Sequence, residues 1–382
     1  MKNQKKLLIV GGEDVYMRVP IIKKLTREGF CVSVVGSGDS DLFKLNNIKF
    51  YNYQLNRRMS LFDDIKTVIQ LRKIFKDYNP DIVQSFDTKP SILVPFASIF
   101  FNHKVTRTIT GMGYAFSSFS FFSSILRKIY KFFQIILDRR VDISIFQNED
   151  DFSYFKKNNL LNNHEGILIR GSGIDLKKID SLDIAAKKDY PHIIKDDDSC
   201  TFLMVSRLVM HKGVMDYLQA AREVKSIYSN CNFILVGPLE KDGEDSISEE
   251  ELLKFSSFVK WLGPRDDVLS IMDISDVFVL PTYYREGLPR VLLEASSKYL
   301  PSITSDMPGC RDVIHNESEG FLIPIKNVDF LKKSMIKLIQ SSELRETMGK
   351  NARHRVENNF SLDLVSRYYA ETYNSLISKN NP

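Results

Sequence analysis

The stretch PTYYREGLPRVLLE (Pro281–Glu294) decides the fold that we expect for this chain of 382 residues. The apolar run directly before it, Val277–Leu280, is typical of a buried strand. Pro289 suits the first turn of a helix, where its missing N–H costs nothing, and helix-forming leucines follow it. The stretch therefore predicts the loop and helix of a strand–loop–helix unit, with Glu286 just before the helix and Glu294 about a turn and a half inside it.

The predicted start of this helix has the chemistry of a ligand site. The N–H groups of Gly287, Leu288 and the first helical residues point at whatever lies in front of them, which favours a phosphate. A carboxylate beside an anion is repelled unless it accepts hydrogen bonds from hydroxyl groups. A nucleotide sugar, which carries both phosphate and hydroxyl groups, meets both requirements. From spacing alone, two solvated glutamates around an ordinary helix start remain an alternative.

Short apolar strands alternate with amphipathic helical patterns along the whole chain, which is typical of parallel α/β sheets. Strands are predicted at Leu7–Val10, Cys31–Val35, Asp81–Val83, Val105–Thr110 and Ser144–Phe146, and then at Phe202–Val205, Phe233–Val236, Val259–Leu262, Val277–Leu280 and Ser302–Thr304. The charged segment Lys177–Ser199 lies between the two series of strands and is predicted to be a linker or a domain edge. We therefore expect two Rossmann-like halves, with ligands at the carboxyl ends of the strands.

Composition excludes several classes of protein. Apolar content of 43% and charged content of 26% describe an ordinary globular protein, and the net charge of +5 comes without an aromatic-basic motif for nucleic acid. The four cysteines form no C-x-x-C pair, so we expect neither a metal cluster nor a disulfide scaffold, and a reducing compartment. No apolar stretch reaches the roughly 18 residues that span a bilayer, and the first apolar run is too short for a signal peptide.

The segment from Glu286 to Glu294 resembles the E-x7-E signature of retaining glycosyltransferases of the GT-B type, in the large family 4 of that classification. Ordered matches over nearly the whole chain add to it at Gly263–Val268, Ser275–Pro281, Pro301–Asp306, Pro308–Ile314 and Glu319–Pro324. The resemblance implies an acceptor-binding domain over residues 1–180 and a nucleotide-sugar-binding domain over residues 181–360. It also implies that residues 361–382 form a helix that returns to the first domain.

Two cations are candidates for the chemistry of the donor. Arg207 and Lys212 resemble the R-L-x-x-x-K-G element of the family, in which both cations contact the donor diphosphate. Fixed cations aimed at the charge that develops on a leaving diphosphate lower the barrier. The resemblance implies these cations in place of a metal, so we expect no metal and no cofactor, and we read Asp196–Asp198 as a solvated turn. Two solvated loop cations remain the alternative.

The resemblance also assigns the remaining donor-side residues. It places Glu286 near the hydroxyls of the donor sugar and Glu294 on the ribose hydroxyls. Backbone groups around the helix start hold sugar and phosphate, and two residues after later strands border the base, although a glycine there is most often only a turn. These residues are Gly287, Leu288, Pro289, Gly237 and Arg265.

The acceptor side is predicted in the first half. Gly11 and Gly12 follow the first strand, where close backbone approach to a ligand needs glycine, but they form no G-x-G-x-x-G motif for NAD. Arg18 resembles part of the family's acceptor-facing loop and helix, and Lys89 is a candidate for an acceptor phosphate, with surface solvation as the alternative. Thr110 stands where many relatives carry a histidine, so we expect no histidine base and assign the acceptor proton to the leaving phosphate.

Three further segments resemble a bacterial subgroup that elongates sugars on polyprenyl diphosphate during O-antigen, capsule or glycan assembly. They are Thr108–Tyr114, Phe146–Asp150 and Arg170–Asp175. The resemblance implies a UDP-sugar donor, a polyprenyl-diphosphate-linked saccharide acceptor, and a cytoplasmic protein peripheral on the inner face of the cell membrane. Phe119–Arg140 is strongly amphipathic, with aromatic residues on one half, so we expect it either to touch the membrane or to face the core.

The expected function is therefore retaining transfer of a hexose or N-acetylhexosamine from a UDP-sugar to a lipid-linked saccharide. Two alternative functions remain open. A nucleotide-sugar epimerase of the same fold needs acid and base groups where this chain has Thr110. A partner subunit that has lost activity is disfavoured by the intact Arg207, Lys212, Glu286 and Glu294. The sequence predicts neither the sugar, nor the linkage, nor the oligomeric state.

Overall fold

A computed structural model describes residues 5–56, 60–113, 116, 121–182, 199–240 and 245–378 of the chain. Tyr114, Phe119–Ser120, Asp196–Asp198 and most of the predicted linker lie outside the described residues. The described chain divides into two compact units, which we call unit 1 (Met1–Gly173 with Leu362–Pro382) and unit 2 (Ile174–Ser361).

The sequence places the first boundary at residue 180, whereas the structure places it at residue 173. The physical reason is that the intervening residues bind to unit 2. The N–H of Ile174 donates to the carbonyl of Phe360 at 2.9 Å, and both nitrogens of the Arg353 fork donate to Asp180 at 2.8 Å.

Unit 1 is built on a parallel sheet of seven described strands in the order β3-β2-β1-β4-β5-β6-β7. The strands are β1 (Lys5–Val10), β2 (Phe30–Gly36), β3 (Lys49–Asn52), β4 (Ile82–Phe86), β5 (Lys104–Ile109), β6 (Ile143–Phe146) and β7 (Glu165–Leu168). From β1 the chain moves outward to β2 and β3, and from β4 it moves outward in the opposite direction. The point where the strand order reverses therefore lies between β1 and β4, which is where such sheets bind ligands.

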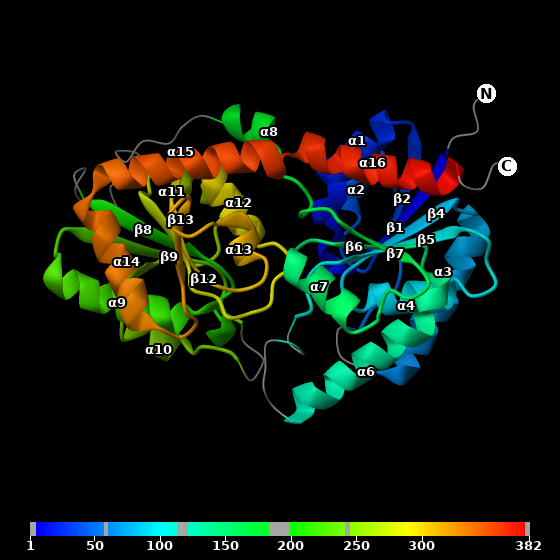
Figure 1. The fold of residues 1–382 in the computed structure, drawn as a ribbon, viewed down its shortest axis with the longest axis horizontal. Helices are drawn as coiled ribbons and strands as arrows, with labels where there is room; N and C mark the ends of the chain where they lie inside the picture. The colour runs from blue at the N-terminus through cyan, green and yellow to red at the C-terminus, as the bar shows by residue number, and fades with distance from the viewer. Residues whose placement is uncertain are drawn as a thin grey trace. The chain divides into compact units, whose positions relative to one another are not determined.

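Helices cover both faces of the sheet in unit 1, because successive residues of β1 point to opposite sides. Leu7 and Ile9 pack with α1 and α16, whereas Leu8 and Val10 pack with α3 and α4. Bounds are η1 (Glu13–Arg18), α1 (Val19–Arg27), α2 (Asp41–Leu45), α3 (Leu61–Tyr78), α4 (Pro90–Ala97), α6 (Phe121–Leu137), η2 (Asp138–Arg140), α7 (Glu149–Lys157) and α16 (Leu362–Ser378). Figure 1 shows α16, in red at the end of the chain, beside α1.

The helix α6 differs from its predicted pattern in one respect. The sequence assigns Gln134 to the polar half, but the structure buries Gln134 completely, and its amide has no hydrogen-bond partner among the described residues. The helix instead exposes a row of large apolar side chains: Phe121, Ile125, Phe132, Ile135 and Ile136. The prediction for Gln134 was wrong because the packing of the whole unit, and not the helical pattern alone, decides which face of a helix is buried.

Unit 2 contains a second parallel sheet, of six described strands in the order β10-β9-β8-β11-β12-β13. The strands are β8 (Cys200–Val205), β9 (Cys231–Val236), β10 (Lys260–Trp261), β11 (Val277–Leu280), β12 (Ser302–Ser305) and β13 (Gly320–Ile323). The order reverses between β8 and β11. The predicted fold class, two Rossmann-like parallel-sheet domains, is confirmed.

Helices cover both faces of this sheet as well, with α9 and α14 on one face and α11, α12 and α13 on the other. Bounds are α8 (Leu176–Asp180), η4 (Met210–Lys212), α9 (Val214–Ile227), α10 (Glu249–Leu253), α11 (Val268–Asp273), α12 (Arg290–Ser297), α13 (Cys310–Val313), α14 (Val328–Gln340) and α15 (Ser342–Asn359). In the part of the chain that the structure describes, no helix is both long and apolar enough to cross a membrane.

Candidate active site

In unit 2, two loops at the carboxyl ends of β8 and β11 are joined through their backbones. The carbonyl of His211 accepts hydrogen bonds from the N–H of Tyr283 at 2.9 Å and from the hydroxyl of Thr282 at 3.1 Å. Gly213 has φ +75°, and a Cβ there would overlap the carbonyl oxygen of Pro281. Glycine is therefore required at the turn into α9, and the turn fixes the two loops against each other.

These loops bring Lys212 and Glu286 together. The Lys212 ammonium forms an ion pair with the Glu286 carboxylate, and the two side chains are only 14% and 19% exposed. The ammonium also lies 5.4 Å from the centre of the Tyr284 ring. The point of strand reversal in unit 2 thus holds a half-buried cation beside a carboxylate, which is the charge pattern that the sequence predicts for sugar and diphosphate.

Arg207 follows the same strand but has a different partner. Its guanidinium lies 3.1 Å from the carboxylate of Glu240, and the side chain is 51% exposed. Sequence reasoning missed Glu240, since an acidic residue after a Gly-Pro turn carries no signal of its own. The structure therefore places both predicted cations on the β8 loop, each beside a carboxylate.

The helix α12 begins at Arg290, with Pro289 directly before it at φ −65°, as the sequence predicts. Glu294 lies in the second turn and accepts a hydrogen bond from Arg290 Nε at 2.9 Å. Burial raises the pKa of the Glu294 carboxyl, and the charge of Arg290 opposes this. A carboxylate kept in a partly buried place despite this cost is typical of a binding residue.

The loop after β12 packs against the backbone of the loop that carries Glu286 and Gly287. Gly309 has φ +81°, and a Cβ there would lie 2.6 Å from the carbonyl oxygen of Gly287. Glycine is therefore required at position 309 for this loop to pack against the backbone of Gly287. The sequence analysis matched Gly309 to the family but did not select it as a site residue.

Gly237 and Arg265, predicted near the base, lie at the ends of β9 and β10. Gly237 has φ +142° and packs against the carbonyl of Ser206, and its own carbonyl accepts a hydrogen bond from Trp261 Nε1 at 3.0 Å. Arg265 makes two hydrogen bonds with the carboxylate of Asp267, at 2.8 and 2.6 Å. In the structure, Gly237 and Arg265 therefore both make contacts with neighbouring residues of unit 2 that stabilise the local backbone and side-chain arrangement.

In unit 1, three predicted positions gather at the reversal between β1 and β4. The carbonyl of Gly11 accepts a hydrogen bond from the Tyr53 hydroxyl at 2.9 Å. The N–H of Gly12 and the hydroxyl of Thr110 both donate to the carboxylate of Asp87, at 3.4 and 3.2 Å. Asp87 was not predicted as a site residue from the sequence, although its place directly after the buried strand β4 was a usable signal.

The two other predicted acceptor-side residues have separate surroundings. The Arg18 guanidinium lies 4.4 Å from the centre of the Phe86 ring and donates to Ser172. Lys89 forms an ion pair with Asp64 at 2.6 Å and donates to the carbonyl of Asn56 at 2.6 Å. Lys89 is thus tied to the start of α3.

Two family models match the chain. The description "Glycosyl transferases group 1" applies to residues 187–355, and "Glycosyl transferase 4-like" applies to residues 6–146. The chain belongs to the glycosyltransferases. The predicted family and enzyme class are confirmed, and neither model supports the epimerase alternative.

Similar proteins agree with this membership. The glycosyltransferase is 27% identical to N,N'-diacetylbacillosaminyl-diphospho-undecaprenol alpha-1,3-N-acetylgalactosaminyltransferase of Campylobacter jejuni, over 96% of this chain and 97% of that protein. It is 29% identical to UDP-Gal:alpha-D-GlcNAc-diphosphoundecaprenol alpha-1,3-galactosyltransferase of Escherichia coli, over 82% and 80%. Its fold matches the crystal structure of a glycosyltransferase from Rickettsia africae with a TM-score of 0.80 and 19% identity, over the full length of both chains.

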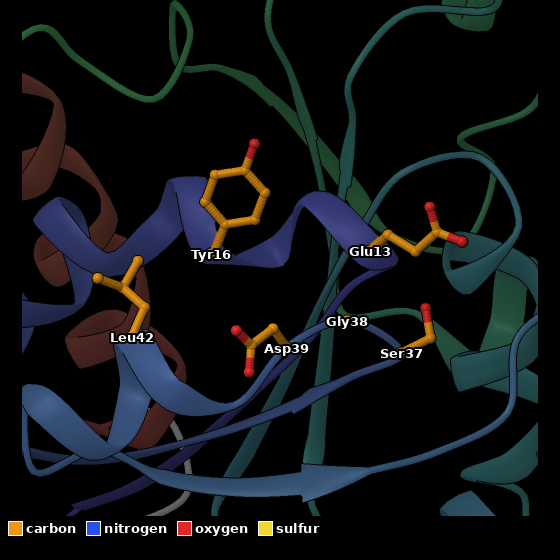
Figure 2. Close-up of a pocket in the computed structure, with 6 residues that line it drawn as sticks. All are labelled: Glu13, Tyr16, Ser37, Gly38, Asp39 and Leu42. Atoms are coloured by element: carbon orange, nitrogen blue, oxygen red, sulfur yellow. The ribbon is translucent and has the colours of Figure 1, made fainter. Parts of the chain in front are cut away.

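Unit 1 of the glycosyltransferase also has a hollow of about 620 Å³ at the carboxyl ends of β1 and β2. Figure 2 shows the side chains around it, which come from η1, from the loop after β2 and from α2. They are Glu13, Tyr16, Ser37, Gly38, Asp39 and Leu42. The Ser37 hydroxyl oxygen is buried without a hydrogen-bond partner among the described residues. Both polar and apolar side chains line the hollow, and η1, which forms part of it, directly follows Gly12.

Proposed function

We propose that this glycosyltransferase moves a hexose or N-acetylhexosamine from a UDP-sugar to a lipid-linked saccharide, with retention, in O-antigen, capsule or glycan assembly. The names of the Campylobacter jejuni and Escherichia coli relatives both contain a diphospho-undecaprenol acceptor, and the second contains a UDP-linked donor. The observation that carries the proposal is the half-buried Lys212–Glu286 pair in front of α12.

In this proposal the donor lies at the strand reversal of unit 2. Glu294 accepts hydrogen bonds from the ribose hydroxyls, and Glu286 accepts one from the transferred sugar. The N-terminal N–H groups of α12 face a phosphate. Lys212 and Arg207 stabilise the charge that develops as the bond between the anomeric carbon and the diphosphate oxygen breaks. The acceptor hydroxyl attacks on the face that the diphosphate leaves, and no metal or cofactor takes part.

Two single variants test the donor assignment. Arg207→Ala and Lys212→Ala are expected to lower the transfer rate by about a hundredfold or more, because each removes a cation from the leaving group. The exposed Arg222 and Lys254 of the same unit supply matched controls as alanine variants. The assay follows saccharide transfer from UDP-galactose and UDP-N-acetylgalactosamine to a polyprenyl-diphosphate-linked saccharide, with and without EDTA. Near-normal transfer by both site variants contradicts the assignment, and loss of activity with EDTA contradicts the metal-free mechanism.

The proposal also places the glycosyltransferase on the inner face of the cell membrane, through α6. Phe121 is 84% exposed and Phe132 is 58% exposed, and the cations Lys128 and Arg139 are exposed near them. α4 contacts both α6 and α3, and the outer face of α3 carries a second apolar row. This row consists of Leu61, Phe62, Ile65 and Ile69. Exposed aromatic and aliphatic side chains with cations beside them suit an anionic lipid surface.

A further inference from the structure

The hollow in unit 1 (Figure 2) has no role in the donor chemistry described above. Its volume of about 620 Å³ falls within the usual range of small-molecule sites, about 300–1,000 Å³. One wall is η1, and the other consists of the loop after β2 and the start of α2. The hollow therefore lies at the carboxyl ends of two neighbouring parallel strands, where sheets of this kind bind ligands.

The two walls of the hollow are packed directly on each other. A Cβ on Gly38 would lie 2.7 Å from the carbonyl oxygen of Glu13, and a Cβ on Gly36 would lie 2.5 Å from the side chain of Val15. Glycine at both positions allows the loop after β2 to approach η1 this closely. Phe43 is completely buried, which fixes α2 to the unit beside this loop. The hollow is thus a preformed feature of unit 1.

The polar part of the lining suits a ligand with several hydroxyl groups. Glu13 and Asp39 each contribute a carboxylate, and Ser37 contributes a hydroxyl. Oδ1 of Asp39 accepts the N–H of Asp41 at 2.9 Å, which orients this carboxylate. Because a carboxylate has about four lone-pair sites, Asp39 can accept further hydrogen bonds. Hydroxyl groups of a ligand are suitable donors for them.

The apolar part of the lining comes from Tyr16 and Leu42, whose side chains are 51% and 40% exposed. Tyr16 follows Glu13 by three residues in η1, so the ring and the carboxylate lie one turn apart on the same wall. An aromatic ring beside carboxylates matches the two kinds of surface on a sugar. The ring packs on the apolar C–H face, and the carboxylates accept hydrogen bonds from the hydroxyls at the edge.

The charge of the lining disfavours an anionic ligand. Both charged side chains that line the hollow, Glu13 and Asp39, are carboxylates, and the six lining residues include no lysine or arginine. Like charges repel, so a phosphate or a uronic acid carboxylate is expected to bind more weakly here than a neutral sugar.

We propose that the hollow is a subsite for a neutral sugar of the acceptor saccharide. The inference rests on the proposed function and deepens it, because it names the part of the acceptor that unit 1 recognises. Hydroxyls of the sugar donate to the carboxylates of Glu13 and Asp39, and its C–H face packs on the ring of Tyr16. The hollow selects a neutral sugar over one that carries a carboxylate or a phosphate, and its residues take no part in the transfer step.

The first test measures binding and needs no transfer. Saturation-transfer NMR with UDP present compares methyl β-galactoside, methyl N-acetyl-β-glucosaminide, methyl glucuronide and putrescine. Wild type is expected to saturate the two neutral glycosides, and Tyr16→Ala is expected to lose this signal. Asp39→Asn is expected to weaken the neutral glycosides and to narrow the gap to the glucuronide, because it removes a repelling charge. Tyr368→Ala and Asp77→Asn, at exposed positions of unit 1, are the matched controls.

The second test measures transfer at varied concentrations of a polyprenyl-diphosphate-linked neutral saccharide. Tyr16→Ala and Asp39→Asn are each expected to raise the acceptor KM by about tenfold or more, as expected for the loss of a charge-assisted hydrogen bond or a comparable contact. The donor KM, and kcat at saturating acceptor, are expected to stay within a few fold of wild type. This pattern separates recognition of the acceptor from a general loss of structure, which lowers kcat as well.

Several results overturn the proposal. They are wild type that binds neither neutral glycoside, glycoside signals that persist unchanged in Tyr16→Ala and Asp39→Asn, equal binding of the glucuronide, and a signal from putrescine alone. An unchanged acceptor KM in both variants also overturns it. Wild type that transfers from no UDP-sugar contradicts the proposed function instead, and the binding test of the hollow still stands in that case.

Discussion

At the scale of single residues, Glu294 shows how a site carboxylate affects stability. Burial raises the pKa of its carboxyl in the folded protein. A carboxyl group with a folded pKa above its unfolded value binds protons more tightly when folded. Its contribution to stability is therefore largest at low pH and falls as the pH rises from the unfolded pKa through the folded pKa. The ionised form costs stability at neutral pH and is retained where a ligand needs it.

This residue-scale reasoning gives a prediction for Glu294→Gln. The variant is expected to be as stable as wild type at pH 7 or more so, because it removes a partly buried charge. It is expected to bind UDP about 10- to 100-fold more weakly, since hydrogen bonds to a charged group contribute about 1.5–3 kcal/mol. Thermal unfolding and calorimetric UDP titration measure the two effects, with the exposed Glu250→Gln as control. Unchanged UDP affinity contradicts the role assigned to Glu294.

At the scale of elements, the exposed apolar rows of α6 and α3 predict that the protein binds to lipid vesicles through these helices. Phe132→Asp combined with Ile136→Asp places two charges on the exposed apolar row of α6. The double variant is expected to lose binding to anionic vesicles while unfolding at the temperature of wild type, because both side chains are more than half exposed. Vesicle sedimentation with anionic and with neutral lipid measures this, and Ile227→Asp, an equally exposed apolar site in unit 2, is the control. Equal binding by all variants excludes this surface as the contact.

The same elements show which features a sequence can predict. The helix after Pro289 was predicted because a proline signal is a local property, whereas the final helix Leu362–Ser378 was expected from the family resemblance. The hydrogen bonds of Asp87 were not predicted, because their donors Gly12 and Thr110 lie far from it in the sequence and meet it only when β1, β4 and β5 pair. The burial of Gln134 likewise depends on tertiary packing, which the pattern of the helix alone does not give.

At the scale of the whole molecule, the C-terminal helix α16 forms part of the hydrophobic core of unit 1, which otherwise consists of the N-terminal residues. α16 supplies Tyr369 and Tyr373, which are completely buried in unit 1. The Tyr373 hydroxyl donates to Gln84 Oε1 at 3.1 Å, and the Tyr369 hydroxyl lies 3.1 Å from that of Thr108. Gln84 and Thr108 belong to β4 and β5, so unit 1 becomes complete only after the last helix is synthesised.

This dependence leads to a prediction about unfolding. Tyr373→Ala is expected to destabilise unit 1 by about 3–5 kcal/mol, the usual cost of removing a buried aromatic side chain. UDP is expected to raise the stability of unit 2 and not of unit 1, since a ligand stabilises only the unit that binds it. Calorimetric scans with and without UDP are then expected to separate two transitions in the variant. Tyr368→Ala, exposed on the same helix, controls for α16 itself. A single transition that Tyr373→Ala and UDP shift together would instead mean that the two units unfold as one.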